Sequence, residues 1–136
     1  MTFSYRGVPS EMYRIGVECR FSAAHRLEGH RGRCSRLHGH SWRVEAVFAA
    51  DEISSGGMLL DFDDARAALE DAVAPFDHRF LNEVEPFDRV APTAENVARE
   101  VFDRLDSRAS GSSWRAGLES VKVWESEDAW ASYERG

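Results

Sequence analysis

The sequence predicts an α+β domain in which a four-stranded antiparallel sheet carries two helices on one face. Three observations support this prediction. Apolar and polar residues alternate in the N-terminal third and again near the C-terminus, two segments between them have helical spacing, and the order is therefore ββααββ. The chain has 136 residues, which is enough for one domain, residues 1–136, with a core that needs no disulfides.

The first two predicted strands both have the two-residue period of a half-buried strand. In residues 12–25 the apolar side chains fall on one face, and His25 falls on that face too. In residues 38–50 the apolar face includes His38 and His40. Antiparallel pairing of these strands would bring His25 opposite the other two histidines.

The rest of the chain gives the remaining elements of the prediction. Residues 1–11 have no periodicity and are predicted to form a loose tail. The other predicted elements are a helix over 62–74 that ends at Pro75, a helix capped by Thr93 whose apolar stripe reaches Leu105, a loop over 106–117, and strands over 118–124 and 129–133.

Three imidazoles on neighbouring strands predict a metal site. Catalytic zinc is commonly held by three protein ligands with an open fourth position, whereas structural zinc is closed by four. His25, His38 and His40 therefore favour a reactive Zn²⁺ site, although copper, iron and nickel also accept imidazole ligands. The alternative is a set of hydrogen-bonded core histidines without a metal.

Four further residues have side chains suited to proton transfer or ligand binding. The thiol of Cys34 is a candidate base, because a nearby cation lowers the pKa of a thiol. Asp77 and His78 form a carboxylate–imidazole pair that could relay a proton. Glu125, at the end of a strand, could accept two parallel hydrogen bonds from a planar heterocycle. The alternatives are a bystander thiol, a surface dipeptide and an exposed glutamate.

Charge and composition restrict the partners and the compartment. A net charge of −7 argues against generic binding to nucleic acid or to a membrane surface. The local cluster of Arg31, Arg33 and Arg36 could attract a small polyanion or could be a solvated loop. No signal peptide or membrane-spanning run is visible, and the two cysteines make no disulfide framework, so we expect a reducing cytoplasm.

Five motifs in order resemble the 6-pyruvoyltetrahydropterin synthase family over about residues 12–133. The motifs are Phe21-Ser22-Ala23-Ala24-His25-Arg26-Leu27, Cys34 with three residues before His38-Gly39-His40, Asp77-His78-Arg79-Phe80-Leu81-Asn82, Pro92-Thr93-Ala94-Glu95-Asn96-Val97, and Val123-Trp124-Glu125. The three-residue gap after the cysteine resembles the bacterial branch, the 6-carboxytetrahydropterin synthases of queuosine biosynthesis.

The resemblance implies a fold, a substrate and an assembly. The fold would be the tunnelling fold (T-fold), with trimers that stack into a homohexamer and active sites at subunit interfaces. The substrate would be 7,8-dihydroneopterin triphosphate, and the products 6-carboxy-5,6,7,8-tetrahydropterin, acetaldehyde and triphosphate. Ser126 and Trp124 depart from residues common in the family, and either could alter which substrate side chains the pocket tolerates.

The resemblance also implies roles for nine residues. They are Zn²⁺ ligation by His25, His38 and His40, proton abstraction by Cys34 with Asp77 and His78 as its relay, anchoring of the pterin by Glu125, and positioning of the pterin by Thr93 and Glu95. Two rival functions remain open. The first is a 6-pyruvoyltetrahydropterin synthase, which eliminates triphosphate, and the second is a non-catalytic zinc- and pterin-binding module.

Overall fold

Two long antiparallel strands form the centre of the sheet in the computed structural model, which describes residues 11–29 and 37–136. They are β1 (Tyr13–His25) and β2 (His38–Ala50). Their register pairs His25 with His38 and Ala23 with His40, which confirms the predicted pairing of the histidine-bearing strands. Cys34 and the arginines at 31, 33 and 36 lie outside the described residues.

Three further strands complete a five-stranded mixed sheet in the order β3-β1-β2-β4-β5. They are β3 (Arg79–Phe80), β4 (Gly117–Trp124) and β5 (Trp130–Glu134). Strand β3 pairs with β1 in parallel, whereas the other neighbours are antiparallel. The prediction of four antiparallel strands in the order ββααββ was therefore wrong in detail, because β3 is only two residues long and too short for any periodicity.

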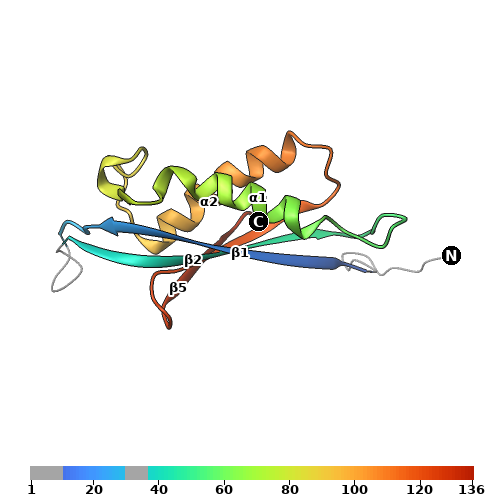
Figure 1. The fold of residues 1–136 in the computed structure, drawn as a ribbon, viewed down its shortest axis with the longest axis horizontal. Coiled ribbons are helices and arrows are strands. Elements are labelled where there is room, and N and C mark those ends of the chain that lie inside the picture. The colour runs from blue at the N-terminus through green and yellow to red at the C-terminus, as the bar shows by residue number, and fades with distance from the viewer. Residues whose placement is uncertain (1–10, 30–36) are drawn as a thin grey trace.

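Two helices cover one face of the sheet, as Figure 1 shows. Helix α1 (Phe62–Val73) begins at the N-cap Asp61, whose carboxylate accepts a hydrogen bond from Asp63 N. Helix α2 (Ala94–Ser110) begins at the predicted cap, Thr93. It extends into residues predicted to be a loop, because Ala109 continues the buried stripe one turn beyond Leu105.

Two short 3₁₀ turns connect the helices to the sheet. They are η2 (Ala74–Phe76), directly after α1, and η3 (Leu81–Glu83), directly after β3. Each buries its apolar side chain, Phe76 and Leu81 respectively, so the connection between the helices packs onto the core. None of the helices in residues 11–29 and 37–136 has the length and apolar composition that crossing a bilayer requires.

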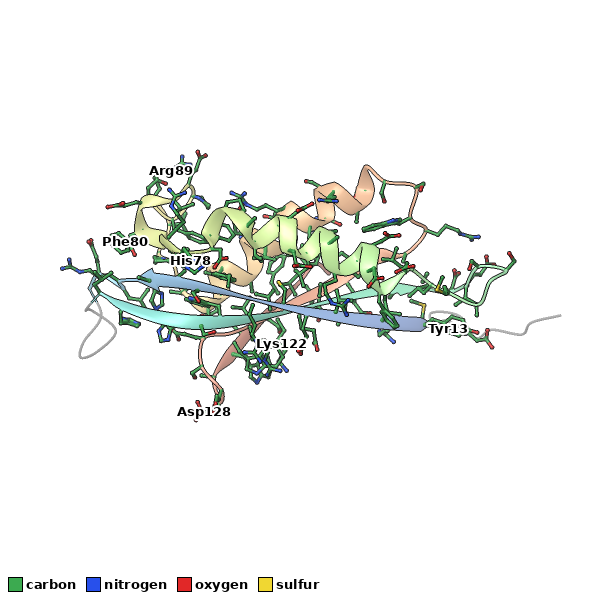
Figure 2. All side chains as sticks on the ribbon, in the orientation of Figure 1. Tyr13, His78, Phe80, Arg89, Lys122 and Asp128 are labelled. Atoms are coloured by element: carbon green, nitrogen blue, oxygen red, sulfur yellow. The ribbon has the colours of Figure 1, made fainter. Side chains whose placement is uncertain are left out.

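The core fills the space between the helices and the inner face of the sheet. Its largest fully buried side chains include Trp42, Phe48, Phe76 and Phe102, and His25 is buried with them. In the described part of the chain no helix covers the opposite face, where Figure 2 shows Lys122 projecting away from the helices. The sheet therefore has a sealed inner face and an accessible outer face, and the histidines stand at one end of the sealed side.

Candidate metal centre and active site

The paired ends of β1 and β2 bring three imidazoles together. His25 is the last residue of β1 and faces His38, the first residue of β2, while His40 lies two residues further on the same face. The ring centroids are 4.5 Å apart for His25 and His38, 4.6 Å for His38 and His40, and 5.1 Å for His25 and His40. The register of β1 and β2 thus brings the predicted triad together.

A carboxylate joins the three imidazoles. Oε1 of Glu125 lies 2.9 Å from Nε2 of His25 and 3.2 Å from Nε2 of His40. The four side chains can place one ligand atom each within 4.8 Å of the others, and these are His25, His38, His40 and Glu125. Glu125 follows β4 in phase with the buried Val121 and Val123, so the alternation that put histidines on the inner side also predicts this neighbour.

The hydrogen bond of His25 to the backbone sets its tautomer. Its Nδ1 lies 2.8 Å from the carbonyl oxygen of Pro92, which can only accept, so Nδ1 carries the hydrogen. In the neutral ring, Nε2 is left with its lone pair, and this atom faces His38 Nε2 at 2.9 Å. A backbone carbonyl that fixes one ring nitrogen is the usual support behind a histidine that binds metal through the other.

Nε2 of His40 is buried, and although Oε1 of Glu125 lies 3.2 Å away, this nitrogen makes no hydrogen bond in the described part of the chain. Burial lowers the pKa of His40, the Glu125 carboxylate raises it, and the neighbouring His25 and His38 lower it further. The net decrease keeps the ring neutral, which is the form that ligates a metal. Lone pairs of imidazoles and an oxygen of a carboxylate thus converge on one point, and this donor set fits a divalent transition metal.

The predicted relay pair, Asp77 and His78, is bound to β1 three residues before His25. Oδ1 of Asp77 accepts from Ser22 N at 3.0 Å, and His78 N donates to Ser22 O at 2.6 Å. His78 has a φ of 59°, and its side chain is 82% exposed. Figure 2 places His78 near the C-terminal end of β1, where it lines a hollow of about 440 Å³ together with His40.

A match to a known protein family covers nearly the whole chain. Residues 14–136 match the family model described as 6-pyruvoyl tetrahydropterin synthase. The chain belongs to this family. Two relatives are named 6-carboxy-5,6,7,8-tetrahydropterin synthase. The one from Synechocystis sp. is 36% identical over 127 residues, which is 90% of this chain and 93% of that protein. The one from Haemophilus influenzae is 30% identical over 150 residues, covering 90% and 99%.

A solved structure of the family has the same fold. The 6-pyruvoyl tetrahydropterin synthase of Caenorhabditis elegans superimposes with a TM-score of 0.80 at 28% identity, over 92% of this chain and 96% of that one. The α+β sheet with two helices is therefore the T-fold of the 6-pyruvoyl tetrahydropterin synthase family. The coarse fold prediction is confirmed, and only the strand count and order needed correction.

Two of the residues implied by the family resemblance lie at the start of α2. The hydroxyl of Thr93 accepts a hydrogen bond from Asn96 N at 3.2 Å and so caps the helix. Glu95 is in the first turn and is exposed. Thr93 directly follows Pro92, so the beginning of this helix is linked to the histidine cluster through the carbonyl that fixes His25.

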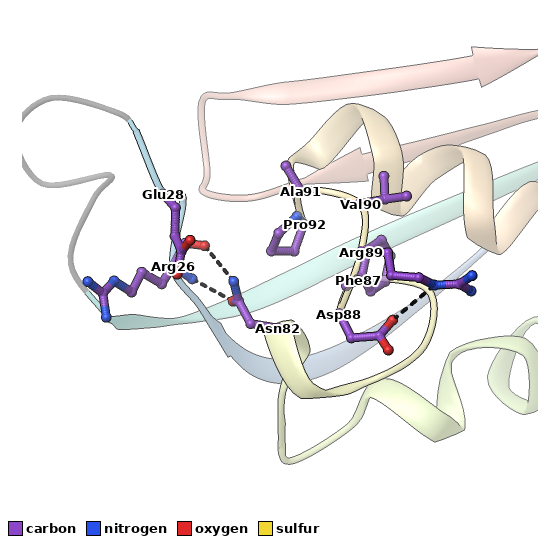
Figure 3. Close-up of a pocket in the computed structure, with 9 residues that line it drawn as sticks. All are labelled: Arg26, Glu28, Asn82, Phe87, Asp88, Arg89, Val90, Ala91 and Pro92. Carbon is purple, nitrogen blue, oxygen red and sulfur yellow. Dashed lines mark hydrogen bonds and ion pairs between the residues drawn. The ribbon is translucent and has the colours of Figure 1, made fainter.

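The side chain of Asn82 and the backbone carbonyl of Pro92 hold the C-terminal end of β1, and the sequence did not predict either role. Oδ1 of Asn82 accepts from Arg26 N at 2.9 Å, and its Nδ2 donates to Arg26 O at 2.8 Å. Figure 3 shows this pair in the wall of a hollow of about 280 Å³ that Pro92 also lines. Asn82 thus fixes the residue after His25, while Pro92 fixes the imidazole itself.

The second thiol, that of Cys19, is unsuited to proton abstraction. Partial burial raises its pKa to about 12, and the negative charges of Glu70 and Asp77 raise it in the same direction. It therefore remains a neutral thiol at physiological pH and behaves as a small apolar side chain against the core. Any thiolate chemistry of this synthase-family chain is left to Cys34, which the structure does not describe.

Proposed function

We propose that the chain is a metal-dependent lyase that converts 7,8-dihydroneopterin triphosphate to 6-carboxy-5,6,7,8-tetrahydropterin, acetaldehyde and triphosphate. The observation that carries the proposal is the convergence of His25, His38 and His40 beside an open hollow of about 500 Å³ that His40 and Glu125 line. The names of the two relatives above support this product. The reaction would be a step toward queuosine or related deazapurines, in the cytoplasm.

In this proposal the three histidines hold Zn²⁺. Glu125, which stands close enough to them to be a fourth ligand, is assigned instead to the pterin. When bound, zinc supplies Lewis-acid chemistry that makes a neighbouring carbinol more acidic. The carboxylate of Glu125 both lines the hollow and contacts His25 and His40. A heterocycle whose N–H groups bind Glu125 would therefore place its side chain close to the metal ligands.

Proton transfer is assigned to Cys34, Asp77 and His78. Cys34 Sγ would accept the proton from the substrate, and the His78 imidazole would pass it on. Asp77 is held by the Ser22 amide, and its Oδ1 lies 3.7 Å from His78 Nε2, so it can orient the ring. The exposed imidazole of His78 suits this role, because a relay must exchange its proton with bulk water. Thr93 and Glu95 would help to position the pterin.

A homo-oligomer is part of the proposal. Strand β3 pairs with β1 only at Ala23 and Ala24, so the same edge of β1 is unpaired over most of its length in the described chain. Strand β5 forms the other edge of the sheet. Open edges of this kind are commonly paired or covered in natural proteins. In a trimer joined edge to edge, the open edge of β1 and the edge strand β5 would both be paired, and two such trimers would form a hexamer.

A second candidate is the 6-pyruvoyl product, formed by elimination of triphosphate without loss of carbon. The similarity to the Caenorhabditis elegans 6-pyruvoyl tetrahydropterin synthase favours it. Both reactions begin with removal of a proton next to the metal, so the same residues serve either. A non-catalytic binding module is the remaining candidate, and it differs by needing no base.

Product analysis with two cysteine variants tests these candidates. Mass spectrometry of the wild-type reaction should detect acetaldehyde and the 6-carboxy product. Cys34→Ala should lower kcat by about 100-fold or more, because it removes a general base, whereas Cys19→Ala should keep the wild-type rate. Triphosphate release without acetaldehyde would instead support the 6-pyruvoyl candidate. Pterin binding without turnover in the wild type would support the binding module.

A further inference from the structure

A row of four large side chains crosses the uncovered face of the sheet. The register pairs Arg20 of β1 with Arg43 of β2, Arg43 with Trp124 of β4, and Trp124 with Trp130 of β5. These residues occupy the positions that alternate with the buried ones, so they project away from the helices. We call these four residues the outer row.

The outer row borders the candidate site because β4 stops pairing at this level. The last pair between β2 and β4 is Arg43 with Trp124, so the segment Gly39–Ser41 of β2 has no β4 partner. The hollow of about 500 Å³ opens at this corner. It is lined from the outer row by Arg20, Arg43 and Trp124, from the metal centre by His40 and Glu125, and by Gly39, Ser41, Ser126 and Glu127.

Two arginines directly opposite one another on neighbouring strands repel each other. The positive charge of Arg43 is partly balanced by two neighbours. Its Nη1 lies 3.3 Å from Oε1 of Glu18, and its guanidinium lies 3.6 Å from the ring centroid of Trp124. Arg20 is exposed and has no hydrogen bond or ion pair in the part of the chain that the structure describes. The hollow therefore has one guanidinium fixed in place and one available to a ligand.

We propose that Arg20 and Arg43 form the anion subsite that receives the phosphate groups of the substrate. This inference rests on the proposed function and extends it to specificity. Paired guanidinium groups bind phosphate oxygens through parallel charge-assisted hydrogen bonds. The opposite wall has Glu125, an acceptor suited to the N–H groups of a heterocycle.

The spacing of the two walls fits a substrate with a ring at one end and an anion at the other. His40 and Arg43 are three residues apart on β2, which corresponds to about 10 Å along an extended strand. The ring end would lie by Glu125 and the metal ligands, and the anionic tail would extend along β2 toward the two arginines. The subsite is built from side chains on β1 and β2.

The test replaces Arg20 and compares it with a matched arginine on the same strand. Arg20→Gln should raise KM for 7,8-dihydroneopterin triphosphate by about tenfold, because it removes charge-assisted hydrogen bonds, while kcat changes less than about twofold. Arg20→Lys should recover part of the loss. Arg14→Gln is the control, because Arg14 lies on the same face of β1 but binds Glu119 at the far end of the strand.

A second measurement separates this inference from the proposed function. Isothermal titration with inorganic triphosphate should give a dissociation constant that rises about tenfold in Arg20→Gln and stays unchanged in Arg14→Gln. Normal turnover with an unchanged KM in Arg20→Gln overturns the subsite but is consistent with the proposed lyase function. Binding of triphosphate through Arg20 without formation of any pterin product supports the subsite and rejects the lyase. An equal rise of the dissociation constant in Arg20→Gln and Arg14→Gln would show that triphosphate is attracted by positive side chains in general, and would overturn the subsite.

Discussion

At the scale of single residues, the two nitrogens of His25 have separate tasks. Nδ1 is bound to the Pro92 carbonyl, and Nε2 faces the other candidate ligands. The ring is fully buried, so neither nitrogen can exchange its partner for bulk water without opening the core. A buried imidazole with a fixed tautomer is a preorganised ligand, which reduces the cost of ordering the site when a metal binds.

Metal binding by the imidazoles gives the first prediction at this scale. His25→Ala, His38→Ala and His40→Ala should each weaken Zn²⁺ binding by more than about 100-fold, since loss of an outer-shell partner alone costs 10- to 100-fold. Competition against a chromophoric chelator measures the affinity. The control is His78→Asn, which keeps a residue that tolerates the φ of 59° and should bind metal normally while losing activity.

Two outcomes would contradict this assignment. Zinc affinity that survives in all three alanine variants would mean that the cluster is a set of core histidines. Loss of zinc in His78→Asn would mean that His78 is a ligand and not a relay residue. Circular dichroism of His38→Ala, His40→Ala and His78→Asn should match the wild type, because none of these three side chains is fully buried, whereas His25 is.

The residues of the site differ in how well the sequence predicts them. The triad follows from alternation, since His25 and His40 each lie in phase with a run of alternating apolar residues. The contact of His25 with Pro92 could not be predicted, because the two residues are 67 positions apart and the acceptor is a backbone carbonyl, a group that every residue has. Arg20 and Arg43 become neighbours only once the register is known, because alternation gives the face of a residue but not its partner.

At the scale of elements, the sequence predicted the strands that are long enough to show alternation, but not the two-residue strand β3. Strands β1 and β2 each contain 13 residues, enough for the two-residue period to be visible. Strand β3 has two residues and exists because η2 and η3 hold it against the end of β1. Its position depends on tertiary packing, which leaves no periodic trace in the sequence.

The cap of α2 gives a prediction at the element scale. Thr93→Ala should lower the free energy of unfolding by about 1 kcal/mol, because the Asn96 amide loses its acceptor. Thr93→Asp should retain wild-type stability, since aspartate is also a favoured cap. If the Thr93 hydroxyl also positions the pterin, as proposed, Thr93→Asp should still raise KM. Urea denaturation and steady-state kinetics separate the two roles, and an unchanged stability of Thr93→Ala would reject the capping role.

At the scale of the whole molecule, the edges of the sheet decide how copies could associate. Glu125 N donates to Ala129 O across the turn between β4 and β5. Because strand residues alternate the side to which their amides point, the amide of Ala131 faces β4 and that of Ser132 faces the free edge. Ser132 is exposed, and its N–H belongs to the row of donors that a second sheet would need.

Removal of that donor tests the proposed assembly without disturbing the chain's own sheet. Ser132→Pro deletes an amide on the free edge and leaves the hydrogen bonds between β4 and β5 in place, whereas Ser132→Ala keeps the amide and is the matched control. Sedimentation velocity should show an oligomer for the wild type and Ser132→Ala, and a shift toward monomer for Ser132→Pro with an unchanged circular dichroism spectrum. A wild type that sediments as a monomer at all concentrations would reject the assembly. Unchanged association of Ser132→Pro would instead place the contacts on another surface, because an edge-paired sheet cannot bridge a missing donor at no cost.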